Sequence, residues 1–334
     1  MRKGVLFISD GKDKIQDYTL QMLAKALLKD GYESLVFNKY TSSTDLEALL
    51  SHYTPSHVVI NDFIVLPDSL IKLKNKLLGV NFYIREVNTH KTFYNSSLFS
   101  LIREYTAGGI KVLTRTRRIF EFSYFLEKLK IPRGMVEWAP DVYLLPSFSS
   151  SIIHRDWRVP IRIGHYNRYM SPEENTFNQY YGMVKFADDI KKAAEFRVLS
   201  VNKLLPSDEV NLISDISHSF PYATIKVCDG LELPSLKKEI MDLDILSHVS
   251  SIDTWFIDFL AVSFNLPVIT DNHRGFLKKY AQCNGEDVFS IAQQYKKIYR
   301  ESSLKRRIRV WKQKWNANRH FQESYQKWIT ILER

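Results

Sequence analysis

The sequence predicts an α/β protein with two Rossmann-like, doubly wound domains that face a central cleft. Three observations lead to this prediction. Apolar strand segments alternate with helical segments through the N-terminal half, and the alternation restarts after a segment rich in Ser and Pro. Residues 242–271 then form one complete strand, loop, helix and strand unit. A helix between two apolar strands makes a parallel crossover, and repeated crossovers build a parallel sheet.

Strands and helices of the N-terminal half follow directly from periodicity. Short apolar runs predict strands at 4–9, 34–38, 57–62, 81–87, 111–114 and 134–140. Apolar residues at helical spacing predict helices at 18–29, 45–52, 70–78, 98–105 and 119–129. Gly31 follows the first helix as a stop signal.

The domain boundary is expected in LLPSFSSSIIHRDWRVP, residues 144–160, which lacks clean periodicity. We therefore divide the chain into domains at 1–150 and 151–300 and a closing helical segment at 301–334. Beyond the boundary the predicted strands are 161–167, 197–202 and 224–230. The predicted helices are 176–194, 209–219, 236–241, 289–300 and 303–333.

The crossover unit at 242–271 points to a ligand site. DILSHV is an apolar strand, TWFIDFLAVSF a buried helix that stops at Asn265-Leu266-Pro267, and VIT a second strand. Parallel sheets bind ligands at the carboxyl ends of their strands. The polar residues at those ends are Ser250, Ser251, Asp253, Thr270, Asp271 and Asn272.

Composition limits the classes of protein that fit. A chain of 334 residues is long enough for two domains with separate cores. It shows no apolar run of membrane-spanning length and no signal peptide. Cys228 and Cys283 lack metal or redox spacing. We therefore expect reduced thiols and a cytoplasmic location.

The positive charge gathers near the C-terminus. Residues 296–334 hold 12 Lys or Arg and 3 Asp or Glu, which supplies +9 of the net charge of +10. Such a segment favours a polyanionic partner, either DNA or an anionic membrane face, or else it is a solvated helix face. Five aromatic residues in it suit one apolar stripe that packs the last helices, or contact with a membrane or nucleic acid. They are Trp311, Trp315, Phe321, Tyr325 and Trp328.

The order of these features resembles the GT-B glycosyltransferases, in particular family-4-like enzymes that use nucleotide sugars. KGVLFISDGKDKIQDYTLQMLAKALLKDGYESLVF looks like their first strand, loop, helix and second strand. VLTRTRRIFEFSYFLEKLKIPRGMVEWAPDVYLL looks like the segment that closes their first domain, with Asp141 at the motif Asp. IRIGHYNR looks like the strand that opens their second domain, and 242–271 like their Glu-x7-Glu region. The resemblance implies an acceptor domain, then a nucleotide-sugar domain, then helices that cross back.

The catalytic candidates follow from this resemblance and from its departures. The second Glu of the Glu-x7-Glu motif falls on Leu260, and Asp253 or Asp258 is the replacement. The resembled enzymes carry a His on the loop after the fourth strand, and this chain has His90 there. A histidine can donate a hydrogen bond to a sugar hydroxyl or stabilise charge at the reacting carbon.

Candidates for donor binding are cationic side chains and backbone amides. In the resembled family an arginine after the first strand of the second domain holds the diphosphate, and Arg168 stands there. Lys185 and Lys203 are candidate partners, each also suited to a solvated surface. The amides of Ser250, Ser251 and Asp253 could cradle phosphate or simply cap a helix. Asn272 completes the set.

No metal and no bound cofactor is expected, only a UDP- or GDP-linked co-substrate. Asp242-Leu243-Asp244 spells the Asp-x-Asp of metal-using glycosyltransferases, but Asp244 matches the ordinary Asp that opens a GT-B strand. No other cluster has metal-ligand spacing.

Acceptor candidates lie on two loops of the N-terminal domain. Gly11 and Lys12 follow the first strand, where a small residue lets the backbone approach a ligand or makes an ordinary turn. Arg115 and Arg117 lie in TRTRR after the fifth strand, at a predicted helix start. Cations there oppose the helix dipole, which favours a polyanionic acceptor over a simple structural role.

Together these features predict a hexosyl- or pentosyltransferase that uses a nucleotide sugar. The resemblance implies a retaining, metal-independent reaction on a glycan or lipid-linked saccharide. The basic segment and TRTRR favour an alternative, the glycosylation of a DNA base as in phage enzymes. The missing Glu pair leaves a third reading, a catalytically degenerate GT-B binding protein.

Overall fold

The computed structural model describes residues 3–40, 42–86, 96–115, 130–132, 134–143, 156–167, 175–201, 219–249, 255–271 and 282–334. The chain divides into two compact units. The first unit contains Met1–Leu144 together with Phe321–Arg334, and the second contains Leu145–His320. Within the described ranges each unit has one parallel sheet of six strands. The predicted pair of doubly wound α/β domains is therefore confirmed.

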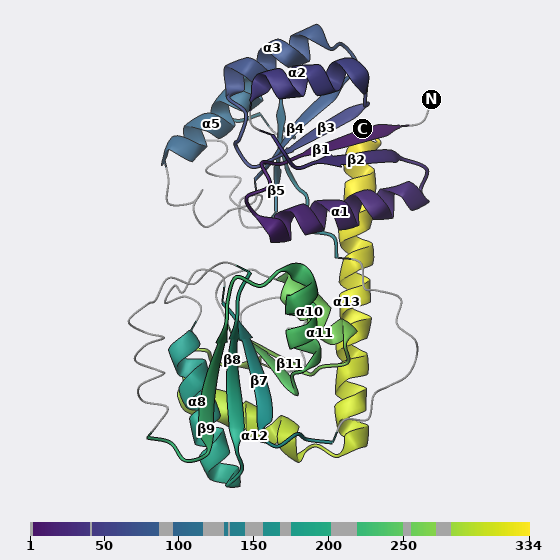
Figure 1. Cartoon of the computed structure of the whole chain (residues 1–334). Helices are drawn as coiled ribbons and strands as arrows, with labels where there is room; N and C mark the ends of the chain where they lie inside the picture. Colours follow the sequence, from purple (N-terminus) through teal and green to yellow (C-terminus); the bar gives the residue numbers. More distant parts are fainter. Residues whose placement is uncertain are drawn as a thin grey trace. The chain divides into compact units, whose positions relative to one another are not determined.

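In the first unit the strand order is β2-β1-β3-β4-β5-β6, and all neighbours are parallel. The strands are β1 Gly4–Ile8, β2 Glu33–Phe37, β3 His57–Asn61, β4 Asn81–Glu86, β5 Lys111–Thr114 and β6 Val136–Trp138. The helices are α1 Lys14–Lys29, α2 Ser43–His52, α3 Pro67–Lys76 and α5 Ser96–Ala107 (Figure 1).

Both faces of this sheet are covered by helices. Leu6 and Ile84 pack with residues of α2, α3 and α5, whereas Phe7 and Tyr83 pack with residues of α1. Successive side chains of a strand point to opposite faces, so both sets must be apolar. This is why the strands appear in the sequence as unbroken apolar runs.

Helix α1 begins four residues earlier than its apolar spacing predicts. The carboxylate of Asp13 accepts hydrogen bonds from the amides of Ile15 and Gln16, each at 3.1 Å. These bonds satisfy amides that have no partner inside the helix. The cap, and not the first apolar residue, therefore fixes the start of the helix at Lys14.

In the second unit the strand order is β12-β11-β10-β7-β8-β9, again parallel throughout. The strands are β7 Ile161–Tyr166, β8 Ala194–Leu199, β9 Ala223–Cys228, β10 Ile245–His248, β11 Val268–Asp271 and β12 Gln282–Cys283. The helices are α8 Thr176–Ile190, α10 Leu233–Met241, α11 Trp255–Ser263, α12 Val288–Arg300 and α13 Ser303–Leu332. Residues of α8 and α12 cover one face, and α10 and α11 lie on the other (Figure 1).

Some element boundaries differ from the predictions. The helix predicted at 176–194 ends at Ile190 because Lys191 turns left-handed, with φ of 52°. Strand β8 consequently starts at Ala194 and not at residue 197. The two-residue strand β12 carries no periodicity and was not predicted. The helix predicted at 119–129, and all but Ser219 of the one at 209–219, lie outside the described residues.

Helix α13 contributes to both units. In the first unit Trp328 is fully buried, its Nε1 donates to the carbonyl of Pro140 at 2.8 Å, and its ring meets Phe7 edge-on. In the second unit the buried Gln313 donates to the carbonyl of Val268 at 2.9 Å and accepts from the same residue's amide at 3.3 Å. The prediction of one aromatic stripe is wrong, because Trp311 and Trp315 are exposed. None of the described helices, α13 included, has the length and apolar character that a membrane crossing requires.

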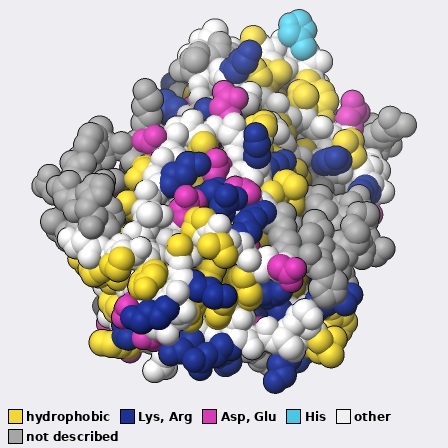
Figure 2. All heavy atoms as spheres, turned by 60° about the horizontal axis from the view of Figure 1, so that its bottom comes forward, with side chains coloured by type: hydrophobic (Ala, Val, Ile, Leu, Met, Phe, Trp, Pro, Cys, Tyr) yellow, Lys and Arg dark blue, Asp and Glu magenta, His cyan; other side chains and the backbone are white. Residues whose placement is uncertain are grey.

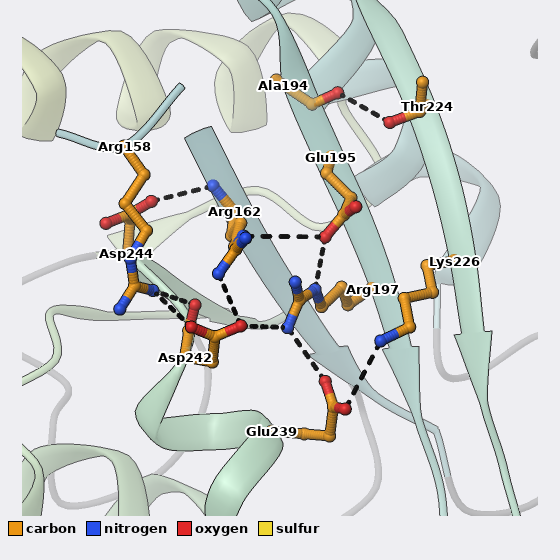
Figure 3. Close-up of polar contacts among 10 residues, drawn as sticks. All are labelled: Arg158, Arg162, Ala194, Glu195, Arg197, Thr224, Lys226, Glu239, Asp242 and Asp244. Atoms are coloured by element: carbon orange, nitrogen blue, oxygen red, sulfur yellow. Dashed lines mark hydrogen bonds and ion pairs between the residues drawn. The ribbon is translucent and has the colours of Figure 1, made fainter. Parts of the chain in front are cut away.

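A network of ion pairs lies near the amino ends of the strands of the second sheet, which we call its amino edge (Figure 3). The carboxylate of Asp242, which caps α10, lies 2.5 Å from a guanidinium nitrogen of Arg162, 2.9 Å from one of Arg197 and 3.3 Å from one of Arg158. Asp244 accepts the backbone amide of Arg162 at 2.9 Å. Both carboxylates of the Asp-x-Asp sequence thus bond to arginine residues at the edge opposite the carboxyl ends of the strands.

Candidate functional site

Each sheet has a point where its strand order reverses direction. In the second unit β7 and β10 lie side by side, while the chain continues from β7 to β8 on one side and from β10 to β11 on the other. In the first unit β1 and β3 hold the same position. Crossover helices diverge at such a point, and ligands of open α/β sheets bind outside the carboxyl ends of the two strands. The candidate sites are therefore the carboxyl ends of β7 and β10 in the second unit and of β1 and β3 in the first, and we call each the carboxyl edge of its sheet.

Two buried side chains fix the carboxyl end of β7. His165 and Asn167 are fully buried, and both reach Thr176 at the start of α8. Asn167 Nδ2 donates to Thr176 Oγ1 at 2.7 Å, and His165 Nε2 lies 3.1 Å from the same oxygen. His165 Nδ1 lies 3.3 Å from the carbonyl of Ser247, so that nitrogen carries the proton. Burial, together with nearby His248, lowers the pKa of His165 to about 3 and keeps the ring neutral.

A glutamine from α8 holds the carboxyl end of β10. Gln179 is fully buried, and its Nε2 donates to the carbonyl of Val249 at 3.2 Å. Its Oε1 accepts from the amide of Val249 at 3.4 Å and from Ser247 Oγ at 2.7 Å. Asn175 donates to the same Val249 carbonyl at 3.2 Å, and the Tyr295 hydroxyl donates to Ser247 Oγ at 2.7 Å. The backbone that leads into residue 250 is thus held by several hydrogen bonds.

Asp258 joins this edge through a histidine. It lies in the first turn of α11, is 3 % exposed, and its Oδ1 is 2.7 Å from Nδ1 of His248. The bond ties the last residue of β10 to the first turn of α11. Asp258 therefore fixes the end of β10 against the start of α11.

Most of the predicted donor residues lie outside the described residues: Arg168, Lys203, Ser250, Ser251, Asp253 and Asn272. The chain connects them directly to described strand ends, since Arg168 follows Asn167 and Ser250 follows Val249. Lys185 is not brought to this edge. It lies in the third turn of α8 and forms ion pairs along the helix with Asp189.

A buried charged cluster lies at the carboxyl edge of the first sheet. Arg85, the fifth residue of β4, is 2 % exposed and its guanidinium pairs with Asp141. The other carboxylate oxygen of Asp141 lies 2.9 Å from Arg115 Nε and accepts the Tyr143 hydroxyl at 2.6 Å. Burial, with the adjacent carboxylate, raises the pKa of Tyr143 well above its usual range. Two cations therefore share one buried anion at the carboxyl ends of β4 and β5.

Residues of β3 and α1 also bond to this cluster or lie at the same edge. Arg85 also donates to Asn61 Oδ1 at 2.7 Å and to Gln16 Oε1 at 3.3 Å. Ser9, after β1, donates to the carboxylate of Asp17. Burial is the main cause that raises the pKa of Asp17. Arg85 was not among the predicted site residues, although a charged pair at the end of the apolar run NFYIRE was a usable signal.

The predicted acceptor residues fall on both sides of the described boundary. Gly11 has φ of 73°, and an added Cβ would lie 2.5 Å from the carbonyl oxygen of Asn38, so a close backbone approach requires glycine there. Lys12 is exposed and pairs with Asp10 at 3.0 Å. Arg115 belongs to the buried cluster. His90 and Arg117 lie outside the described residues, in the segments of the chain that follow β4 and β5.

Within the described ranges no three His, Cys, Asp or Glu side chains gather in a way that could hold a metal ion. At the first sheet the described polar groups are two arginines, Arg85 and Arg115, with the carboxylate of Asp141. At the second sheet they are buried amide and hydroxyl groups together with the His248–Asp258 pair. Arginine suits anionic ligands, and amide and hydroxyl groups suit hydroxylated ones.

The fold defined here is that of the GT-B glycosyltransferases, as the sequence predicts. Among the solved structures that match essentially the whole chain are the following three. An α-glucosyltransferase in complex with UDP and a 13-mer DNA containing an HMU base has a TM-score of 0.70, with 10% identity and 100% of both chains covered. A UDP-forming α,α-trehalose-phosphate synthase from Burkholderia xenovorans has a TM-score of 0.68, with 9% identity and 100% and 99% covered. A glycosyltransferase from Rickettsia africae ESF-5 has a TM-score of 0.66, with 11% identity and 99% and 98% covered.

No family model matches the sequence, and no curated protein matches it significantly. At identities near one residue in ten, the likeness to the solved structures concerns the fold.

Proposed function

We propose that this protein is a glycosyltransferase that moves a sugar from a UDP- or GDP-linked donor, bound by the second unit. One observation carries the proposal. At the switch point between β7 and β10, buried side chains hold the strand ends that Arg168 and Ser250 directly follow in the chain. Strand ends held in this way suit a site whose hydrogen-bond donors act on a diphosphate.

The chemistry assigned to this edge is stabilisation of a leaving nucleoside diphosphate. As the bond from the sugar to the diphosphate breaks, negative charge grows on the departing oxygen. The Arg168 guanidinium and the amides of Ser250, Ser251 and Asp253 neutralise it, with Lys203 and Asn272 nearby in the loops. In this proposal Asp253 or Asp258 replaces the missing Glu, and the transfer proceeds without a metal ion and retains the anomeric configuration.

In the same proposal the acceptor lies at the edge of the first unit. His90 follows β4 in the chain, the strand whose Arg85 belongs to the Arg85–Asp141–Arg115 cluster, and Gly11 and Lys12 follow β1. His90 contacts the reacting sugar, and Arg115 and Arg117 face the acceptor. The first candidate acceptor is a glycan or a lipid-linked saccharide.

A base in DNA is the second candidate acceptor. Two observations favour it, the net charge of +10 and the TM-score of 0.70 to the α-glucosyltransferase in complex with DNA. Binding to DNA would weaken steeply with salt, because each neutralised phosphate releases counterions. A gel shift at two salt concentrations, with and without an HMU base, separates the two acceptor classes.

The donor assignment is tested by a thermal-shift screen of nucleotide sugars. We expect one donor to raise the melting temperature of the wild-type chain, because a ligand of the native state stabilises it. Arg168→Ala should abolish that shift, while Lys185→Ala, whose lysine pairs with Asp189 along α8, should retain it. Equal shifts in both variants would remove Arg168 from the donor site.

Release of UDP or GDP then distinguishes an enzyme from a binding protein. A transferase releases the nucleotide when an acceptor is present, and EDTA leaves the rate unchanged if no metal takes part. Donor binding without any release across an acceptor panel would support the catalytically degenerate alternative.

A further inference from the structure

The N-terminal half of α13 exposes an apolar stripe. Leu304, Ile308, Trp311 and Trp315 follow one another at spacings of four, three and four residues, which places them on one helix face. Their exposed fractions are 63 %, 44 %, 64 % and 53 %. Large side chains rarely gather in this way on the surface of a soluble monomer without a binding role.

The opposite face of the same helix is buried in the second unit. Val310, Gln313 and Ala317 are 6 %, 0 % and 0 % exposed, and Gln313 bonds to both backbone groups of Val268. The helix is therefore held in one orientation about its axis, and its stripe points outward.

Basic residues flank the stripe on both sides. Residues 303–322 contain seven Lys or Arg and no Asp or Glu. Arg306 stacks on Trp157 at 4.4 Å and Arg309 pairs with Glu301, so these two serve packing within the unit. By helical spacing, the other five lie beside the stripe, with Lys305, Lys312 and Arg319 on one flank and Arg307 and Lys314 on the other. Figure 2 shows another view of the surface, on which hydrophobic, basic and acidic side chains are interspersed.

We propose that this face of α13 docks on an anionic membrane surface. Tryptophan prefers the interface between headgroups and acyl chains, and leucine and isoleucine gain free energy by leaving water there. Each lysine or arginine near anionic headgroups adds about 1 kcal/mol of attraction. Single-stranded DNA would reward the cations and the stacked rings, whereas a continuous aliphatic stripe such as Leu304 and Ile308 gains more by entering the boundary between headgroups and acyl chains. The combination of aliphatic side chains, tryptophan and flanking cations therefore selects a lipid surface.

This docking does not depend on sugar transfer. It needs neither a donor nor the loops at the carboxyl edges, so it stands or falls separately from the proposed function. If both hold, the enzyme acts next to a membrane, where a lipid-linked acceptor would be found.

Vesicle sedimentation of the full chain tests the proposal. With vesicles of phosphatidylcholine containing about 30 % phosphatidylglycerol, we expect binding that weakens as salt rises, and little binding to pure phosphatidylcholine. The double variant Trp311→Ser, Trp315→Ser should bind at least about tenfold more weakly. Lys305→Gln with Lys312→Gln should weaken binding and flatten its salt dependence.

A matched control is Phe289→Ser. Phe289 is 64 % exposed, like Trp311, but lies at the start of α12, so this variant should bind vesicles like the wild type. Unchanged melting temperatures confirm that the exposed substitutions leave the fold intact. The proposal fails if the wild type ignores anionic vesicles, if the stripe variants bind them normally, or if the stripe instead mediates a DNA gel shift or dimerisation.

Discussion

Two buried histidines stay neutral in the folded chain. Burial, helped by Lys3, lowers the pKa of His57 to about 4, and His165 has a pKa lowered to about 3. In the unfolded chain a histidine has a pKa near 6.5. The unfolded state therefore binds protons first as the pH falls. The stability due to each neutral ring is complete above about pH 6.5 and is lost as the pH falls through the folded value.

We therefore predict that the free energy of unfolding decreases from pH 7 to pH 4. Each of the two histidines adds a slope of up to about 1.4 kcal/mol per pH unit in that window. His57→Gln should reduce the pH dependence of the free energy of unfolding by up to about 1.4 kcal/mol per pH unit, the contribution of one proton. Urea unfolding at several pH values measures this dependence. A slope that is unchanged or steeper in the variant would contradict the assignment.

Also at the scale of single residues, the sequence did not decide whether Asp253 or Asp258 replaces the missing Glu. The structure describes only the second of them, and gives it a buried partner, His248. His248 and Asp258 are ten residues apart in the sequence. The crossover from the end of β10 to the start of α11 brings them together. Spacing alone did not predict this pair, because His248 reads in sequence as part of an apolar strand.

Helix α8 holds the carboxyl end of β10. Gln179→Ala removes three hydrogen bonds to that strand end. If the proposed donor residues Ser250, Ser251 and Asp253 bind the donor, we expect its KM to rise about tenfold or more, because they directly follow this strand end. The measurement is kinetics with the donor found in the thermal-shift screen.

Gln313→Ala is the control for this prediction. Gln313 is also fully buried and also bonds to both backbone groups of one residue, but Val268 begins β11 at the amino edge. Both variants should lose similar stability, and Gln313→Ala should leave the donor KM unchanged. Similar rises of KM in both variants would indicate a general loss of structure instead of positioning.

We expect the ion-pair network at the amino edge to stabilise the fold and not to take part in ligand binding. Asp242→Ala removes the anion shared by Arg158, Arg162 and Arg197, and Arg197 is only 5 % exposed. Because Asp242 itself is 40 % exposed, we expect a moderate loss of about 1–3 kcal/mol in denaturant unfolding. Asp188→Ala breaks an exposed pair with Lys191 and should cause no measurable change. Equal effects in the two variants would mean that the network adds nothing.

At the scale of the whole molecule, residues 321–334 complete the core of the first unit. Trp328→Ala removes a fully buried ring together with its bond to Pro140. We expect a loss of about 3–5 kcal/mol, confined to the unit in which the ring lies.

Hydrogen exchange measures this loss unit by unit. Amides of β1 should exchange faster in Trp328→Ala, while those of β7 keep their protection. Trp311→Ala, at an exposed position of the same helix, should alter neither. Faster exchange in β7 as well would show that the two units unfold together.

The fold could be predicted from sequence because its signal is local. Strands such as GVLFI, buried on both faces, and amphipathic helices between them leave a periodic pattern that needs no knowledge of distant contacts. The predicted element boundaries were wrong where the local pattern gives no signal, at the Asp13 cap and at the left-handed Lys191. The two-residue strand β12 was missed for the same reason.

By itself the sequence determined two parallel α/β domains, the strand ends from which ligand loops leave, and the concentration of positive charge in the last helices. Only the tertiary structure decided which polar groups meet at those strand ends. Arg85 reaches Asp141 across 56 residues, and Gln179 reaches Val249 across 70. It also decided that Trp328 is core while Trp311 and Trp315 are surface. Hydrophobic periodicity specifies the face that an element buries, but a buried polar group is defined by its partner, and these partners come from remote segments that no local pattern encodes.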